Sequence, residues 1–142
     1  ILDEPTSGLD PAMAEDVLQA LVAHAGGEET TVFFSSHQIA EVDQIADHIA
    51  IVDRGRTVVA GALDEVREQY RRVQLVFGGD APTVALKSPG VLKVTRQGRV
   101  LSVLTRDREA VMAEARTLSP ASIDATPVTL KEIFLESVRT ED

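Results

Sequence analysis

The sequence contains no cysteine and no tryptophan, and aromatic residues amount to only 4% of the chain. The absence of cysteine excludes disulfide bonds and thiolate metal sites, and it is consistent with a reducing cytoplasm. No apolar run approaches the roughly 20 residues of a membrane-spanning helix, and no secretory signal is visible. Because 44% of the 142 residues are apolar, a globular core of Ala, Val, Leu and Ile is feasible.

Positive charge is nearly absent from the first part of the chain. Residues 1–61 hold 11 Asp and Glu but only two basic residues, Arg54 and Arg56, whereas residues 62–142 hold 12 acidic and 12 basic residues. The two parts therefore carry net charges of −9 and 0, which indicates two regions with different roles. An acidic first region argues against nucleic-acid binding, which needs basic surface to neutralise phosphates.

The first region opens with a strand pattern followed by a helix pattern. Ile1–Asp3 is expected to end a buried strand, and Asp10 with Pro11 to begin a helix. Residues at helical spacing predict one apolar face on that helix: Ala14, Val17, Leu18, Leu21, Val22 and Ala25. The pair Gly26 and Gly27 is expected to end the helix in a left-handed cap.

The alternation continues to residue 61. The β-branched and aromatic run Thr30–Ser35 predicts a buried strand, and Ile39–Ala46 predicts a short helix. His48–Val52 and Thr57–Ala60 predict two strands joined by a turn at Asp53–Arg56, where Gly55 supplies a positive φ. This order predicts an α/β fold with a parallel sheet covered by helices.

The second region has a different pattern. Leu63–Arg72 is a charged helix that suits a linker. Beyond it, strands are expected at Val73–Phe77 and Ser122–Thr126, and a hairpin at Val91–Thr95 with Arg99–Thr105. A helix is expected at Asp107–Leu118, with Val111 and Ala115 inward, and a last helix begins with capping-box spacing at Thr129. We therefore divide the chain into residues 1–61, a linker helix at 62–72 and a small α+β domain at 73–142.

The adjacent carboxylates Asp3 and Glu4 are the strongest chemical signal. At the end of a strand, where the backbone changes direction, both side chains can reach one cleft. One carboxylate can hold Mg²⁺, directly or through water, and the other can orient or deprotonate a water that attacks a phosphate. An isolated Asp-Glu pair is usually solvated surface. The functional interpretation of Asp3 and Glu4 therefore depends on the whole run from Ile1 to Pro11, ILDEPTSGLDP.

This run resembles the Walker B strand, catalytic glutamate and D-loop of ABC-type ATPases. The resemblance implies a partial P-loop NTPase fold in which Asp3 associates with magnesium and Glu4 is catalytic. It also implies that Ser7, Gly8, Leu9 and Asp10 form the D-loop, which contacts the partner subunit and aligns the nucleotide sites. ATP and Mg²⁺ would be the ligands.

His37 follows the strand pattern in Phe34-Ser35-Ser36-His37. A lone histidine is more often structural than catalytic, but this position resembles the switch histidine of the same family, which contacts the γ-phosphate. His24 and His48 match no motif. The run from Glu41 to Gly55 resembles the end of the ATPase domain, and we expect its acidic side chains to be solvated surface without chemistry.

Two motifs of the family do not occur in the 142 residues: the phosphate-binding Gly-x-x-x-x-Gly-Lys-Ser/Thr and the Leu-Ser-Gly-Gly-Gln signature. Because these motifs precede Walker B in the family, and Ile1 falls inside a strand pattern, we interpret the chain as the C-terminal part of a subunit. By itself it is expected neither to bind nor to hydrolyse ATP usefully. Its incomplete sheet is expected to expose an edge and oligomerise through residues 1–60.

The final helix pattern, Leu130–Glu136, resembles the ending of ATPase subunits of ABC-2 drug and polysaccharide exporters, although it is also an ordinary amphipathic helix. The leading hypothesis is therefore an exporter ATPase that pairs with a second ATPase subunit and a transmembrane permease, with no nucleic-acid partner, at the cytoplasmic face of the cell membrane. Two alternatives stay open. One is a non-transporter ABC-fold ATPase of DNA maintenance or translation, and the other is a noncatalytic dimerisation or regulatory module dominated by residues 73–142.

Overall fold

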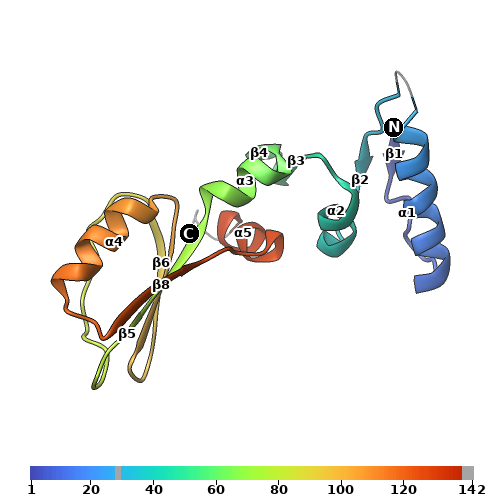
Figure 1. Cartoon of the computed structure of the whole chain (residues 1–142). Helices are drawn as coiled ribbons and strands as arrows, with labels where there is room; N and C mark the ends of the chain where they lie inside the picture. The colour runs from blue at the N-terminus through green and yellow to red at the C-terminus, as the bar shows by residue number, and fades with distance from the viewer. Residues whose placement is uncertain (28–29, 139–142) are drawn as a thin grey trace. The chain divides into compact units, whose positions relative to one another are not determined.

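The computed structural model describes residues 1–27 and 30–138. The chain divides into two compact units, Ile1–Ile49 and Ala50–Asp142. Figure 1 shows the course of the chain through its elements. Within the described residues, no helix combines the length and apolarity needed to cross a bilayer.

The first unit is built on a short parallel strand pair. Strand β1 (Leu2–Asp3) pairs in parallel with β2 (Phe34–Ser35), and the register places Asp3 opposite Ser35. Helices α1 (Pro11–Ala25) and α2 (Ile39–Ile45) complete the unit. As predicted, Asp10 begins α1, because its side chain accepts hydrogen bonds from two backbone amides of the first turn, with Pro11 at the first helical position.

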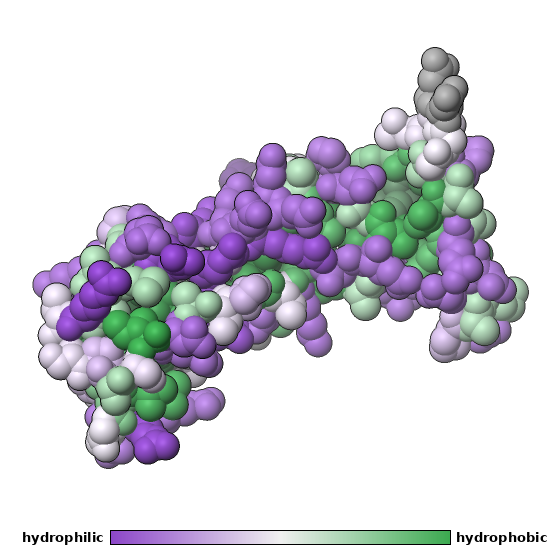
Figure 2. All heavy atoms as spheres, viewed as in Figure 1, coloured by the Kyte–Doolittle hydropathy of each residue, from purple (hydrophilic) through white to green (hydrophobic). Residues whose placement is uncertain are grey.

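Four expectations for this unit were wrong in detail. Strand β1, expected to be buried, is exposed at both of its residues. The strand expected at Thr30–Ser35 is confined to Phe34–Ser35, and Phe33 is 66% exposed. Gly26 caps α1 with φ −74°, so the helix does not end in a left-handed cap. Of the predicted apolar face of α1, only Leu18 is buried. Figure 2 shows apolar atoms at the surface of this unit, where the strongly exposed apolar side chains are Ile1, Met13, Val22 and Phe33.

The predicted sheet is smaller than expected. Strand β3 (His48–Asp53) does not join β1 and β2 but pairs with β4 (Arg56–Ala62) in a separate two-stranded sheet. Arg54 and Gly55 both have positive φ, 48° and 76°, which is the geometry of a tight hairpin turn. The turn prediction is thus confirmed, whereas the described residues contain only a two-stranded parallel pair in place of a larger parallel sheet.

The second unit contains a four-stranded antiparallel sheet in the order β6-β7-β5-β8. Helix α3 (Leu63–Gln69) leads into β5, and helices α4 (Arg108–Thr117) and α5 (Leu130–Ser137) pack against the sheet. The strands are β5 (Arg71–Val76), β6 (Val91–Gln97), β7 (Val100–Thr105) and β8 (Ser122–Thr126). The predicted α+β character of this region is confirmed, and β8 has the predicted bounds.

Alternation along the strands produces a two-faced sheet. Helix α4 covers the apolar face (Figure 1), and both residues predicted to point inward from it, Val111 and Ala115, are fully buried. The strands contribute Val73, Leu75, Leu101 and Val103 to the same core. The capping box predicted at Thr129 is also present: its side chain accepts from the amide of Glu132, whose carboxylate accepts from the amide of Thr129.

The connection between β5 and β6 is held against α4 by Glu114. Its carboxylate accepts hydrogen bonds from the amides of Lys87 and Ser88 and from the Ser88 hydroxyl. These bonds, with that from Lys87 foremost, lower the pKa of Glu114 below its usual range. Further along, Gly90 has φ +80°, and its carbonyl accepts from the amide of Arg106 at 2.8 Å.

We predict that Gly90→Ala destabilises the second unit by about 2 kcal/mol, because positive φ is costly for alanine. The added Cβ would also lie 2.9 Å from Asp107 Cβ and N. Urea unfolding combined with amide exchange in β7 measures the loss. Gly98→Ala is the matched control, because Gly98 has φ +54° but nothing within 4 Å of the added carbon. An equal effect of the two substitutions would contradict the close approach at Gly90.

Candidate functional site

The candidate site lies where β1 and β2 end. Because the two strands are parallel, their carboxyl ends meet at one edge, and the chain continues there into Glu4 on one side and Ser36-His37 on the other. Residues more than 30 positions apart in sequence are therefore brought together. The structure assembles Asp3, Glu4 and His37, all singled out from the sequence, around Ser35.

Glu4 has an unusual backbone. Its φ is +48°, in the left-handed region that non-glycine residues seldom occupy. The conformation is held by the Glu4 amide, which donates to the Ser35 carbonyl at 3.1 Å and to Ser35 Oγ at 3.0 Å, and by the Glu4 carbonyl, which accepts from the Ser7 amide at 3.0 Å. The chain therefore turns at Glu4, directly after the end of β1.

The two carboxylates have different partners. Glu4 Oε2 lies 2.7 Å from His37 Nδ1, and Asp3 Oδ1 accepts a hydrogen bond from Ser35 Oγ. Since an ionised carboxylate can only accept, Nδ1 carries the proton in the contact with Glu4. The His37 side chain is 72% exposed and that of Glu4 32% exposed, so both can be reached by a ligand.

A complete metal cage is not formed here. Among the residues that the structure describes, no group of three or more His, Asp or Glu side chains is arranged to hold a metal ion. Asp3 nevertheless fits the role predicted for it, because it is an exposed oxygen ligand at a strand end. Mg²⁺ is usually bound through one or two carboxylates, with waters and phosphate oxygens completing its shell.

The segment Ser7–Asp10 forms the tight connection between the site and α1. The Leu9 amide donates to the Thr6 carbonyl at 3.2 Å, and Gly8 has φ +78°. Asp10 is occupied as the helix cap, since its Oδ1 accepts from the amides of Ala12 and Met13 at 3.0 Å. Ser7 and Gly8 are exposed. The segment thus has the form of an exposed loop, and its predicted contact with a partner subunit stays a prediction.

Sequence reasoning missed Glu41. We expected the acidic side chains of this stretch to be solvated, but Glu41 is only 8% exposed. Its Oε2 accepts hydrogen bonds from Thr6 Oγ1 at 2.7 Å and from Ser36 Oγ at 3.2 Å. The available signal was the pair of hydroxyl residues beside the two catalytic candidates, Thr6 two positions after Glu4 and Ser36 one position before His37.

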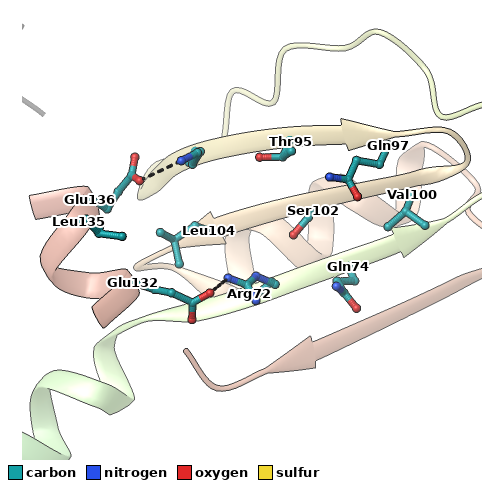
Figure 3. A pocket seen from close by; sticks show the side chains of 11 residues that line it. Arg72, Gln74, Thr95, Gln97, Val100, Ser102, Leu104, Glu132, Leu135 and Glu136 are labelled. Carbon is teal, nitrogen blue, oxygen red and sulfur yellow. Dashed lines mark hydrogen bonds and ion pairs between the residues drawn. The ribbon is translucent and has the colours of Figure 1, made fainter. Parts of the chain in front are cut away.

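A second concave feature lies in the second unit, on the sheet face opposite α4. It is a cavity of about 310 Å³ between the strands and α5. Figure 3 shows the side chains that line it, among them the polar strand residues Gln74, Thr95 and Ser102. Two ion pairs border it, Arg72 with Glu132 and Lys93 with Glu136. Because its charges are paired in this way, the cavity has no net preference for an ionic ligand.

Partial burial raises the pKa of Glu132, but hydrogen bonds from Arg72 and the amide of Thr129 outweigh it, so the pKa lies below its usual range. The carboxylate therefore links α5 to β5 in its ionised form.

Comparison with known proteins identifies a family for the chain. Residues 61–138 match the family described as "ATP-binding protein DrrA1-3-like, C-terminal domain". An uncharacterised ABC transporter ATP-binding protein of Alkalihalophilus pseudofirmus is 34% identical over 145 residues, which cover 99% of this chain and 54% of that protein.

Two relatives have names that state a role. The daunorubicin resistance ATP-binding protein DrrA3 of Streptomyces coeruleorubidus is 35% identical over 150 residues, covering 96% of this chain and 45% of that protein. The Nod factor export ATP-binding protein I of Rhizobium sp. is 27% identical over 138 residues, which cover 95% of this chain and 45% of that protein. The chain spans about half the length of these curated relatives.

We predict that Glu132→Gln removes a pH-dependent part of the stability of the second unit. A carboxyl group whose pKa is lower in the folded than in the unfolded protein stabilises the fold at pH values above its unfolded-state pKa. This stabilisation is lost as the pH falls through the folded-state pKa. The variant should thus be less stable near pH 7 by about 1 kcal/mol or less, and the difference should shrink below about pH 4.5. Glutamine keeps the capping box, so the substitution isolates the effect of the charge.

The stability difference is measured by unfolding both proteins at pH values from 7 to 3, with the exposed Glu65→Gln as control. A difference that does not change with pH would contradict the assignment.

Proposed function

The chain belongs to the ABC transporter ATP-binding proteins with a DrrA-like C-terminal domain, and on this premise we propose that it is the C-terminal part of a subunit that hydrolyses ATP to drive export. The observation that carries the proposal is the contact between Glu4 and His37 beside Asp3 at one strand edge. An acid-base pair next to a magnesium-type carboxylate is what hydrolysis of a phosphoanhydride requires.

Glu4 is assigned as the group that orients the attacking water and accepts its proton. His37 keeps the Glu4 carboxylate in place through Nδ1, and its Nε2 donates to a γ-phosphate oxygen. A ring that donates through both nitrogens is an imidazolium, so His37 in this role also places positive charge where negative charge develops. Asp3 would hold Mg²⁺ through a carboxylate oxygen, and the bound ion would neutralise phosphate charge.

The partners follow from the same premise. Ser7, Gly8, Leu9 and Asp10 are proposed to meet a second ATP-binding subunit, because most of this loop is exposed while α1 anchors its end. A separate transmembrane permease is proposed as the transport path, with the subunit on the cytoplasmic face of the membrane. Export is favoured as the direction because two relatives are named for drug resistance and for Nod factor export.

In the protein expressed from its complete reading frame, we predict that Glu4→Gln lowers kcat for ATP hydrolysis at least about 100-fold, because glutamine cannot accept the proton of the water. His37→Ala should lower kcat about 10- to 1,000-fold. Neither variant should lose ATP binding, because neither residue supplies the main phosphate contacts. Steady-state phosphate release and nucleotide binding measure the two properties.

Matched control substitutions are Glu65→Gln on the exposed face of α3 and His24→Ala on the exposed face of α1, and both should keep wild-type turnover. Full ATPase activity in Glu4→Gln would refute the proposed role of this site.

We further predict that the 142-residue chain by itself neither binds ATP in the micromolar range nor hydrolyses it, because its sequence has no glycine-rich phosphate loop with a lysine. Calorimetric titration with Mg-ATP, with Glu4→Gln as the turnover control, tests this. Micromolar binding together with turnover that Glu4→Gln abolishes would contradict the prediction.

A further inference from the structure

We infer that Glu41 is a positioning residue that holds the loop of Glu4 and the loop of His37 in one arrangement, and this inference rests on the proposed ATPase function. Glu41 lies in the first turn of α2 and is only 8% exposed, although it carries a carboxylate. Side chains of this type are seldom buried without partners. The partners of Glu41 come from both loops of the site.

The first contact fixes the loop that follows Glu4. Thr6 is 1% exposed, and its hydroxyl donates to Glu41 Oε2 at 2.7 Å. No buried side-chain oxygen or nitrogen among the described residues lacks a hydrogen-bond partner, and for Thr6 the partner is this carboxylate. Thr6 is therefore held at a point two residues beyond the left-handed backbone of Glu4. A residue with φ +48° keeps that conformation only when its surroundings determine it.

The second contact fixes the loop that precedes His37. Ser36 Oγ donates to the same Glu41 oxygen at 3.2 Å and accepts from the amide of Gln38 at 3.0 Å. The backbone on both sides of His37 is thus held by one hydroxyl, which is in turn held by Glu41. Because Thr6 and Ser36 share a single acceptor atom, neither loop can shift without disturbing the other.

The carboxylate itself has a firm support. Helix α2 is tied to α1 through Gln44, whose Nε2 donates to Glu15 Oε1 and Oε2 at 3.2 and 3.3 Å. Helix α1 begins directly after the loop that contains Thr6. The helix that carries Glu41 is therefore linked to the helix that follows the Thr6 loop. Glu4 and His37, which the two loops carry, lie 2.7 Å apart.

This arrangement predicts an effect on turnover rather than on nucleotide affinity. Glu41 makes no hydrogen bond or ion pair with Asp3, Glu4 or His37, so its removal changes the positions of the proposed catalytic groups and not which groups are present. Displacement of a catalytic group by about 1 Å is enough to lower kcat about 100-fold. In the protein expressed from its complete reading frame, we expect Glu41→Ala to lower kcat about 10- to 100-fold while KM for ATP changes less than about 2-fold.

The decisive comparison is a double-mutant cycle with His37→Ala. If Glu41 acts by placing His37 against Glu4, then Glu41→Ala should add little to the loss already caused by His37→Ala. Glu41→Gln retains an acceptor oxygen and should recover most of the activity. Additive losses in the cycle would overturn the inference, because a purely structural role acts independently of His37.

A spectroscopic test separates this inference from the proposed function, since it needs no ATP turnover. In the 142-residue chain, the ¹⁵N chemical shifts of the His37 imidazole report its hydrogen bond to Glu4, and Glu4→Ala gives the reference for its loss. We expect Glu41→Ala to move these shifts toward that reference and Glu41→Gln to leave them near wild type. Unchanged His37 shifts in Glu41→Ala would overturn the positioning role even if the protein is an ATPase.

Two further variants keep the test decisive if Glu41→Ala does not fold. Thr6→Val removes one hydroxyl donor at nearly constant shape, and Ser36→Ala removes the other. Each should shift the His37 signals in the same direction as Glu41→Ala, and each should lower kcat. The exposed Asp47→Asn, just beyond α2, is the control and should change neither. His37 signals that respond to neither Thr6→Val nor Ser36→Ala would refute the link.

Discussion

The parallel pairing of β1 with β2 is the constraint on which the candidate site depends. Only two residues of each strand take part, yet their register determines that Asp3 faces Ser35 and that the chain leaves both strands at the same edge. An antiparallel pair would place Glu4 and His37 at opposite ends of the strands. The acid-base contact, the Ser35 hydrogen bonds and the Glu41 network all follow from this single geometric relation.

The two units meet the demands of folding in different ways. The second unit buries a continuous apolar core between its sheet and α4, and its polar groups lie on the opposite face. The first unit has few fully buried apolar side chains and instead buries Thr6 and Glu41 against each other. A buried polar contact of this kind is sensitive to direction as well as distance. It therefore specifies one loop arrangement where apolar packing alone would permit several.

How far the sequence predicts the structure depends on the range of the interactions involved. Most local signals were reliable: the Asp10 cap, the Arg54-Gly55 turn and the Thr129 capping box depend on neighbours within a few residues, and all three are present. The left-handed cap expected at the end of α1 is the exception. The catalytic candidates could be named because their run is specific. Glu41 could not, because its burial depends on hydroxyls up to 35 positions away. Strand β3 was misplaced for a similar reason, since a short apolar strand fits either of two sheets equally well by pattern.

The charge of the first unit limits what its residues can contribute under the proposed function. Residues 1–49 contain ten aspartate and glutamate residues and no lysine or arginine, so this unit repels a nucleoside triphosphate over the range of a Debye length. Under the proposed function, attraction for the phosphates must therefore come from Mg²⁺ or from cationic groups outside these residues. The contribution proposed for Asp3, Glu4 and His37 is thus alignment and proton transfer rather than nucleotide affinity. Glu41 adds to this negative charge, so under the proposed function its contribution is the placement of Glu4 and His37 through Thr6 and Ser36.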